Sequence, residues 1–365
     1  MIVIADDITG AAEIAGIAFS KGHQVSLVCG EGVATNEITV IATDTRSMTA
    51  AEAVSETKRI AKFSLGARPF PRLTGTLPCA LFKKTDSALR GNVVAELSTL
   101  MQATGYERAV YLPANPSKGR IICNGTYYIN GKPIAETAFS YDPEFPAKTS
   151  VLRERFSDAE QKGIIMPDAE SEEDIRRIIA EYNDGQTLFA GAADMFSALL
   201  NANHGDRLSD SSLRFSNHGV CPHDSHDTLI LCGSTQSKAL DLGIAIAPMP
   251  RKIYDGANDL SLWNIEAYTK SGSIILTIPH THRTGKEVAV HLRTVMAEMA
   301  KRLVSEHRPS QLIIEGGATA WAALQAIGWS QFDIICQIAP GVVQMRAANG
   351  TLVTLKPGSY SWGKL

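Results

Sequence analysis

The sequence lacks the long hydrophobic runs and the one-sided charge that mark membrane and nucleic-acid-binding proteins. Its apolar runs are only a few residues long, far short of the roughly 18 that a membrane-spanning helix needs. No basic segment precedes the apolar start MIVIA, so a secretory signal is not indicated. The formal net charge is -3, and like charges form no block that could bind nucleic acid or an anionic membrane. We expect a cytoplasmic protein that binds neither.

Cysteine and histidine are too scattered to suggest a disulfide framework or a zinc site. The 6 cysteines include no CxxC pair, so we expect reduced and mostly buried thiols. The pairs His223/His226 and His280/His282 have no third ligand at a defined spacing, which leaves any metal ligands unknown. The chain also has no GxxxxGK[ST] motif and no well-placed GxGxxG motif, which excludes the two common nucleotide-binding fingerprints.

Length and composition indicate an ordinary globular protein of more than one domain. The chain has 365 residues, of which 44% are hydrophobic and 20% charged, and one compact core rarely serves a chain so long. Residues 206–227 are polar and His-rich, as in a linker. We therefore predict domains at 1–205 and 228–365, joined by a linker at 206–227. The oligomeric state stays open, and a homo-oligomer is compatible with the sequence.

Short apolar runs alternate with helical patterns along most of the chain. IVIA at residues 2–5 precedes a helix with apolar residues from Ala11 to Ala18, and the strand-like QVSLV follows. The alternation returns around residues 79–101 and again from residue 229 onwards. Strands that alternate with helices are typical of a parallel sheet. We predict an α/β fold in which each domain is a mostly parallel sheet with flanking helices.

One stretch departs from this alternation. YYINGKPI places Asn130 and Gly131 between apolar flanks, which is the strongest short-range signal for a β-hairpin. We expect an inserted antiparallel hairpin in the N-terminal domain.

Polar clusters follow three predicted strands of the N-terminal domain. In open parallel sheets, ligands bind beyond the carboxyl ends of the strands, so these clusters are candidates for one site. They are Asp6, Asp7 and Thr9 after IVIA; Lys83, Lys84, Asp86 and Arg90 after CALF; and Asn115, Lys118 and Arg120 after AVYL.

The stretch KKTDSALRGN favours a site for a carboxylate. Arg90 offers a planar fork that matches a carboxylate, and Lys84 adds a point charge. Gly91 lets the backbone approach a ligand closely, and Asn92 can cap the helix that follows. The alternative is a solvated loop in which Asp86 simply pairs with Arg90.

The stretch ADDITG has three interpretations. Asp6 and Asp7 could supply a general base for a hydroxyl together with a hydrogen-bonding anchor, or they could merely cap the next helix. Aspartyl phosphatases carry their nucleophile in a D-x-D-x-T pattern after the first strand, and here the order Asp6-Asp7-Ile8-Thr9 is one residue short.

Glycine-containing turns follow three predicted strands of the C-terminal domain. They are CGSTQS with Gly233 and Ser234, EGGATA with Gly316 and Gly317, and KPGSYSWG with Lys356 and Gly358. Such turns expose backbone N–H groups that can cradle phosphates, although many glycines after strands only make tight turns.

Several segments of the chain together form one set of motifs. ADDITGA spans Ala5–Ala11, KTDSALRGN spans Lys84–Asn92, and PANPSKGR spans Pro113–Arg120 with an Asn124-Gly125 hairpin after it. Gly316, Gly317 and Thr319, the turn Pro340-Gly341-Val342 and the segment Lys356–Gly363 follow near the end. Over nearly the whole chain these segments resemble the four-carbon acid sugar kinase family.

The resemblance implies an ATP-dependent kinase that phosphorylates the terminal hydroxyl of a four-carbon sugar acid such as threonate, erythronate or an oxo-tetronate. It implies ATP and Mg²⁺ as cofactors, an acid-sugar-binding domain at 1–205 and a nucleotide-binding domain at 228–365. When the family's binding residues are transferred motif by motif, the residues expected to bind the acid are Asp6, Asp7, Lys84, Asp86, Arg90, Gly91 and Asn92. Those expected to bind ATP are Ser234, Gly316, Gly317, Ala318, Thr319 and Gly358. Ala318 stands where many relatives are acidic, and Pro357 where they have serine, so Glu315 is considered as a substitute acid.

The mechanism expected from these residues is phosphoryl transfer by positioning and charge stabilisation. Arg90 and Lys84 would hold the carboxylate, and Asp7 or Asp86 would orient the hydroxyl and accept its proton. Two alternatives remain: an aspartate-dependent phosphatase or hydrolase, and a non-catalytic sugar-acid-binding protein.

Overall fold

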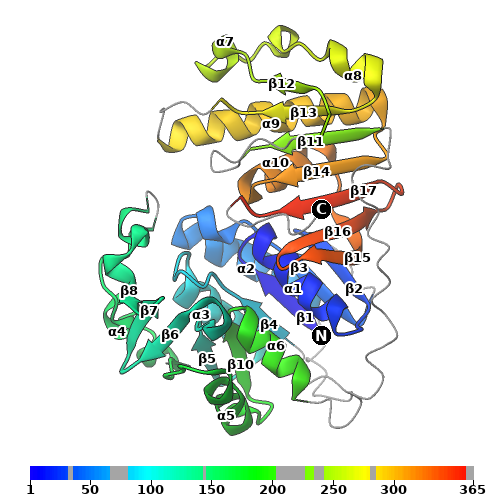
Figure 1. The fold of residues 1–365 in the computed structure, drawn as a ribbon. Helices are drawn as coiled ribbons and strands as arrows, with labels where there is room; N and C mark the ends of the chain where they lie inside the picture. The colour runs from blue at the N-terminus through cyan, green and yellow to red at the C-terminus, as the bar shows by residue number, and fades with distance from the viewer. Residues whose placement is uncertain are drawn as a thin grey trace. The chain divides into compact units, whose positions relative to one another are not determined.

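The computed structural model of the protein describes residues 1–31, 36–65, 81–142, 145–202, 227–233, 242–279 and 285–358. The chain forms two compact units, Met1–Arg214 and Phe215–Leu365 (Figure 1). The segment predicted as a linker, residues 206–227, lies outside the described residues except for Asp227. Each unit has the mixed α/β architecture that the sequence predicts.

The first unit is built on a parallel sheet. Its order across the described residues is β2-β3-β1-β4-β10-β5-β9, and each neighbouring pair is parallel. The strands are β1 (Ile2–Ala5), β2 (Val25–Cys29), β3 (Ile38–Ala42), β4 (Leu81–Lys84), β5 (Arg108–Leu112), β9 (Ile164–Ile165) and β10 (Thr187–Gly191). Strands β2, β3, β4 and β10 are buried along their whole length. Strands β2, β3 and β10 are mostly apolar, as expected for a parallel sheet covered on both faces, whereas β4 ends in Lys83 and Lys84.

Helices cover this sheet in two groups. Helix α1 packs against α6 and α6 against α5, whereas α2 packs against α3 (Figure 1). The connection from β1 to β2 and the connection from β3 to β4 run in opposite directions across the sheet, so right-handed crossovers place α1 and α2 on opposite faces. The helices are α1 (Ile8–Ser20), α2 (Ala50–Leu65), α3 (Val93–Thr104), α4 (Leu152–Arg155), α5 (Glu172–Tyr182) and α6 (Ala193–Asn201).

The inserted hairpin predicted from the sequence is confirmed. Strands β6 (Arg120–Cys123), β7 (Thr126–Ile129) and β8 (Lys132–Pro133) form a small antiparallel sheet. The turn between β7 and β8 is Asn130-Gly131, with φ of 50° and 77°. Positive φ at both central residues matches the twist of antiparallel strands, which explains the Asn-Gly sequence. Short 3₁₀ helices η3 (Ile134–Glu136) and η4 (Ala138–Tyr141) follow.

The second unit has its own mostly parallel sheet. Its order is β12-β13-β11-β14-β17-β16-β15, in which β16 pairs antiparallel with both β15 and β17. The strands are β11 (Thr228–Cys232), β12 (Ile246–Pro248), β13 (Ile274–Thr277), β14 (Gln311–Glu315), β15 (Gln331–Ala339), β16 (Val342–Ala347) and β17 (Leu352–Lys356). The helices are α7 (Arg251–Tyr254), α8 (Glu266–Ser271), α9 (Lys286–His307) and α10 (Gly317–Ile327).

Some elements were not predicted. The sequence pattern did not identify β3, although ITVIA at residues 38–42 is fully buried, and it did not identify α2, β12 or β16. Asn92 was predicted to cap α3. It does occupy the position before the helix, but its side chain makes no capping hydrogen bond, because its amide donates to the carbonyls of Thr45 and Met48 at 2.9 Å each.

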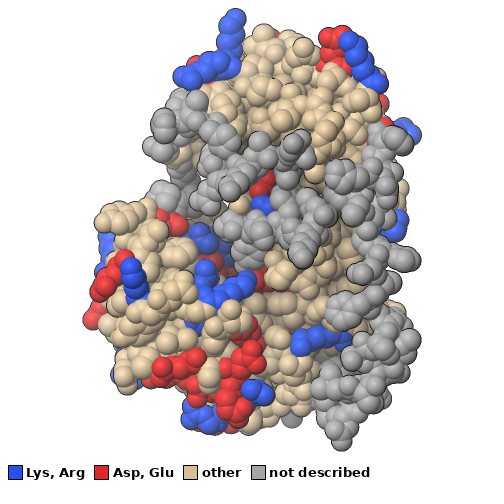
Figure 2. All heavy atoms as spheres, in the orientation of Figure 1, with Lys and Arg blue, Asp and Glu red and all other residues tan. Residues whose placement is uncertain are grey.

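The surface charges and the cysteines are arranged as the sequence composition predicts. Lys and Arg side chains are interspersed with Asp and Glu side chains on the face in view (Figure 2). Cys29 and Cys232 are buried and Cys123 and Cys336 partly buried, all four with free thiols, while Cys79 and Cys221 lie outside the described residues. Within the described part of the chain, no helix has the length and apolar character needed to cross a membrane.

Candidate active site

The site of the first unit lies at the carboxyl ends of three adjacent strands. Strand β1 is in the middle, with Ala5 opposite Ala42 of β3 on one side and Lys84 of β4 on the other. The loops that follow these strands therefore leave the sheet side by side. They bring together two of the polar clusters of the sequence and one residue that the sequence analysis did not select, Arg46.

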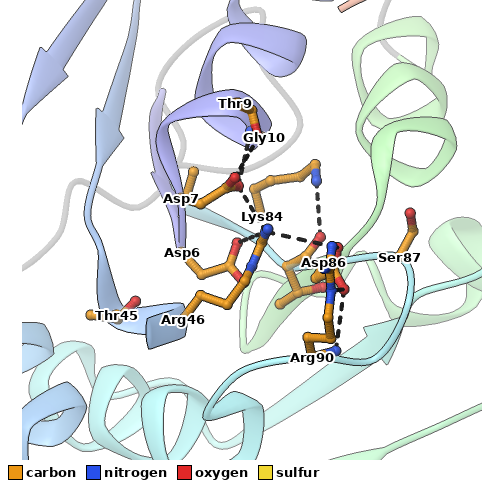
Figure 3. A network of polar contacts seen from close by, with 12 residues as sticks. Asp6, Asp7, Thr9, Gly10, Thr45, Arg46, Lys84, Asp86, Ser87 and Arg90 are labelled. Atoms are coloured by element: carbon orange, nitrogen blue, oxygen red, sulfur yellow. Dashed lines mark hydrogen bonds and ion pairs between the residues drawn. The ribbon is translucent and has the colours of Figure 1, made fainter. Parts of the chain in front are cut away.

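Arg46 is the central cation of this edge. It lies in the 3₁₀ helix η1 (Thr45–Ser47), and its side chain is 15% exposed. Its Nε and Nη2 donate to the two carboxylate oxygens of Asp6 at 3.0 and 2.8 Å, and Nη2 also donates to Asp7 Oδ1 at 2.7 Å. The same nitrogen is 3.9 Å from Asp86 Oδ1. Figure 3 shows the guanidinium among these three carboxylates.

Asp7 caps helix α1 and faces the site at the same time. Its Oδ1 accepts from the backbone N–H of Gly10 at 2.9 Å, and its Oδ2 accepts from the hydroxyl of Thr9. Burial would raise the pKa of Asp7, but Arg46, Thr9, Lys84 and the Gly10 amide together hold that pKa below its usual value. Asp7 is therefore ionised at neutral pH, so the capping interpretation is confirmed without excluding a chemical role.

Asp86 and Arg90 form a fork-to-fork pair. Arg90 donates from Nε to Asp86 Oδ2 at 2.7 Å and from Nη2 to Oδ1 at 3.1 Å. The backbone amides of Ala88 and Arg90 also donate to Oδ2, at 3.1 and 3.2 Å. Burial opposes ionisation, but Arg46, Arg90 and Lys84 outweigh it and hold the pKa of Asp86 well below its usual range. The pair weighed as an alternative from the sequence is thus present.

The side chains of the two lysines in the KKTDSALRGN stretch lie on opposite faces of the sheet. Adjacent residues of a strand point to opposite faces, and Lys83 is fully buried against Glu96 of α3, with Nζ 2.5 Å from Oε2. It therefore does not join the site, which corrects the expectation that the cluster acts together. Lys84 stays at the site, where Nζ donates to the Thr85 carbonyl at 2.9 Å and lies 3.6 Å from Glu13.

Gly91 allows the loop after β4 to pass close to the aspartates. Its φ of +93° belongs to the left-handed region that favours glycine. A Cβ atom at this position would lie 3.4 Å from Asp6 Oδ2 and 3.5 Å from Arg46 Cγ. Asn92 ties the same loop to η1 through its two carbonyl contacts. These residues therefore hold the site together without carrying charge.

The third polar cluster, after β5, reaches the same edge. Asn115 Oδ1 accepts from the backbone amide of Asp194 at 2.9 Å. Lys118 pairs with Glu13, the residue that also faces Lys84. Arg120 donates to the hydroxyl of Ser87, within the KKTDSALRGN stretch.

The glycine turns of the second unit also converge. Strand β14 lies between β11 and β17, with Glu315 opposite both Cys232 and Lys356. Gly233, Gly316 and Gly358 therefore follow three adjacent strands at one sheet edge. Gly316, with φ of +101°, precedes helix α10, which has no side-chain cap. Gly317, Ala318 and Thr319 form the first turn of that helix.

Close packing at this edge requires Gly233. A Cβ atom there would lie only 1.8 Å from the hydroxyl of buried Thr319, which no side-chain adjustment could accommodate easily. Ser234, predicted beside it, lies outside the described residues. Gly233 therefore lets Thr319, in the first turn of α10, pack directly against the end of β11. The uncapped N–H groups of that turn suit a phosphate group.

Glu315 is held by a buried ion pair. Its Oε1 accepts from Lys356 Nζ, and the two side chains are 1% and 4% exposed. Burial, with Glu315 nearby, raises the pKa of Cys232 to about 12. Across the described residues, no group of three or more His, Cys, Asp or Glu side chains is placed to hold a metal ion.

Sequence reasoning missed Arg46, although a signal existed. TDTRS follows the buried apolar run ITVIA just as ADDITG follows IVIA. Because β3 was not recognised as a strand, the polar residues after it were not placed at the sheet edge.

Comparison with known proteins adds two family models and several relatives. A model described as "Sugar-binding N-terminal domain" matches residues 1–162, and one described as "Nucleotide-binding C-terminal domain" matches residues 262–360. A D-threonate kinase of Salmonella typhimurium is 29% identical over 54% of this chain and 53% of its own length. A 3-oxo-tetronate kinase of Brucella melitensis is 26% identical over 98% of this chain and 92% of its own length.

Two solved structures share the fold. A Salmonella typhimurium protein has a TM-score of 0.71, with 99% of this chain and 96% of that chain covered. A Haemophilus influenzae protein has a TM-score of 0.68, with 99% and 97% covered. Both are 18% identical to this chain, a level at which the likeness concerns the fold alone.

The pair of buried Asp86 and partly exposed Arg90 makes a testable contribution to stability. Asp86→Asn should lower the free energy of unfolding by about 3 kcal/mol at pH 7, because Arg90 loses its ionic partner. The folded-state pKa of Asp86 lies below its unfolded value, so this contribution is complete above about pH 4 and is lost as the pH falls further. Urea unfolding should therefore show the two proteins converging in acid.

The matched control is Asp158→Asn, at a surface pair with Lys162, which should change the free energy of unfolding by less than about 0.5 kcal/mol. A loss from Asp86→Asn that is equal at neutral and acid pH would contradict the electrostatic explanation.

Proposed function

Because the chain belongs to the four-carbon acid sugar kinase family, we propose that it transfers the γ-phosphate of ATP to the terminal hydroxyl of a four-carbon sugar acid. The chain is a phosphotransferase, and the reaction makes two chemical demands on it. One surface must hold a small hydroxylated anion, and another must hold a triphosphate. The sheet edge of the first unit meets the first demand, and the glycine-rich edge of the second unit meets the other.

The charge arrangement of the first unit is the observation that carries this proposal. Four cations, Arg46, Lys84, Arg90 and Lys118, lie among carboxylates at one sheet edge and are already held by hydrogen bonds. Preorganised charges of this kind bind an anion without reorganising at the moment of binding. Arg90 contributes through Nη1, whose contact with Asp142 is a long 3.5 Å. A substrate carboxylate could approach that nitrogen more closely and accept a shorter hydrogen bond from it.

Asp7 is the residue best placed to orient the reacting hydroxyl. Asp86 already accepts from two backbone amides and a guanidinium fork, whereas Asp7 Oδ2 accepts from the Thr9 hydroxyl. The lowered pKa of Asp7 makes it a weak base. A weak base suffices here, since in the loose transition state of phosphoryl transfer the hydroxyl proton leaves late. Asp6, held by both arms of Arg46, acts as an anchor.

The second unit offers a fitting environment for the phosphates of ATP. The first turn of α10, with Gly316, Gly317, Ala318 and Thr319, presents N–H groups that a side chain does not cap. Gly233 and Gly358 keep the neighbouring strand ends free of bulky side chains. ATP bound there would supply the phosphoryl group, and a Mg²⁺ ion carried with it would offset the negative charge of the phosphates.

The activity is tested directly by ADP release. The purified chain is incubated with ATP and Mg²⁺ and, one at a time, with D-threonate, D-erythronate and a 3-oxo-tetronate. We expect at least one acid to stimulate ADP release and to be recovered as its phosphate ester, because one unit offers charges that suit an acid and the other offers N–H groups that suit a triphosphate. Release of phosphate from phosphorylated acids without ATP would indicate a phosphatase instead. Binding of an acid without any turnover would indicate a binding protein, and either result contradicts the proposal.

The role of Asp7 is tested by an isosteric change. Asp7→Asn should lower kcat with the best acid by about 100-fold or more, since the amide cannot accept the hydroxyl proton. The KM for ATP should stay unchanged, because the nucleotide contacts belong to the second unit. Asp158→Asn serves again as the control. A kcat for Asp7→Asn within about three-fold of wild type would exclude Asp7 as the residue that accepts the proton.

A further inference from the structure

Arg120 differs from the other cations of the first unit's sheet edge in having no carboxylate partner. Arg46 pairs with Asp6 and Asp7, Arg90 with Asp86, and Lys84 and Lys118 with Glu13. In the described part of the chain, Arg120 donates to the Ser87 hydroxyl and stacks on Phe139, and it has no ion pair. It is therefore a guanidinium whose charge the protein leaves uncompensated.

The position of Arg120 is fixed by its backbone. It is the first residue of β6, and its amide and carbonyl both bond to Asn115, at 3.2 and 2.8 Å. Asn115 in turn fixes the start of α6 through the amide of Asp194. The partner of Arg120 is also held, because the Ser87 carbonyl accepts from Tyr127 at 2.5 Å. Arg120 thus points at the KKTDSALRGN turn from a rigid support.

Phe139 places two guanidiniums around one ring. Arg90 and Arg120 lie 5.9 and 5.8 Å from the centroid of its ring. The ring faces attract cations and give both side chains an apolar surface to pack on. Two like charges so near one ring repel each other unless an anion lies close. Asp86 and Asp142 face Arg90, so Arg120 is the guanidinium of the two that an added anion would pair with.

Arg155 offers a useful contrast. It too lacks a carboxylate partner in the described part of the chain, but its Nε and Nη2 both donate to the Leu89 carbonyl, at 3.1 and 3.0 Å. Leu89 has a positive φ of 64°, so that fork is used to hold a strained turn. The fork of Arg120 has no such use.

We infer that Arg120 is a specificity-determining residue that receives the carboxylate of the substrate, with Ser87 beside it and Arg90 on the other side of Phe139. This inference rests on the proposed function. The neighbouring pair of Arg90 and Asp86 is close to neutral, so Arg120 supplies the net positive charge that selects an acid over a neutral sugar. The matching group is a small carboxylate, because the planar fork suits a bidentate contact.

The test is steady-state ADP release with saturating ATP and varied D-threonate, D-erythronate or 3-oxo-tetronate. Arg120→Gln should raise the KM for the preferred acid by about 30-fold or more, as expected for loss of a charged partner. Its KM for ATP should stay within about two-fold of wild type. Arg120→Lys, which keeps the charge but loses the fork, should raise the acid KM by about 5- to 10-fold.

The control is Arg153→Gln, which removes an exposed guanidinium paired with Glu160 in the same unit and should leave both KM values unchanged. An acid KM within about two-fold of wild type for Arg120→Gln would overturn the inference, as would an equal rise of both KM values. If Arg120→Gln does not fold, the same criteria apply to Arg120→Lys. Failure of the wild-type chain with every acid would instead reject the proposed function, and the two failures are thus told apart.

Discussion

The guanidinium of Arg46 is the interaction on which the rest of the first unit's site depends. It holds Asp6 through two hydrogen bonds and Asp7 through a third, and it lies within 3.9 Å of Asp86. Without a cation among them, three carboxylates this close would repel each other. Burial opposes the charge of Arg46 as well, but the three aspartates raise its pKa well above the ordinary value. Each charge stabilises the ionised form of the opposite charges around it, at the carboxyl ends of the strands where water is largely excluded.

In the function that we propose, the two units would meet their chemical demands by different means. The first would use side-chain charges that are fixed by one another, and an anion would enter as one more member of the network. The second would use backbone N–H groups at the start of α10, which no side chain caps. A phosphate needs several donors around a sphere, and main chain supplies these at little entropic cost. A sugar acid needs discrimination between a carboxylate and hydroxyls, and side chains supply that.

Much of this could be predicted from the sequence, because it depends on local pattern. The alternation of apolar runs and helices gave the α/β architecture, and Asn130-Gly131 gave the hairpin. The placement of Asp7 and Asp86 at strand ends followed from the same pattern. What remained hidden depends on partners distant in the chain. Lys83 and Lys84 look equivalent in sequence, yet only the register of β4 and the buried Glu96 show that one faces away from the site.

Arg46 and Phe139 were missed for a related reason. Each acts on a residue 40 or more positions away, Arg46 on Asp6 and Phe139 on Arg90. Such a contact can be inferred only when the strands that bring the residues together are recognised, and β3, which precedes Arg46, was not. Capping of α3 by Asn92 failed as a prediction because the side-chain NH2 group donates to two carbonyls at η1, which fixes the side chain in an orientation where its oxygen makes no capping hydrogen bond. The conflict between local preference and tertiary contact arises at the site itself, where functional constraints are strongest.

The central claim is that Arg46 positions both aspartates for reaction, and Arg46→Lys tests it most directly. A lysine keeps the charge but cannot hold two carboxylates in a fixed geometry. With the acid and ATP both saturating, kcat should fall by about 100-fold. The free energy of unfolding, measured in urea, should change by no more than about 2 kcal/mol. A kcat that stays within about three-fold of wild type would show that the geometry set by Arg46 is not what the reaction requires.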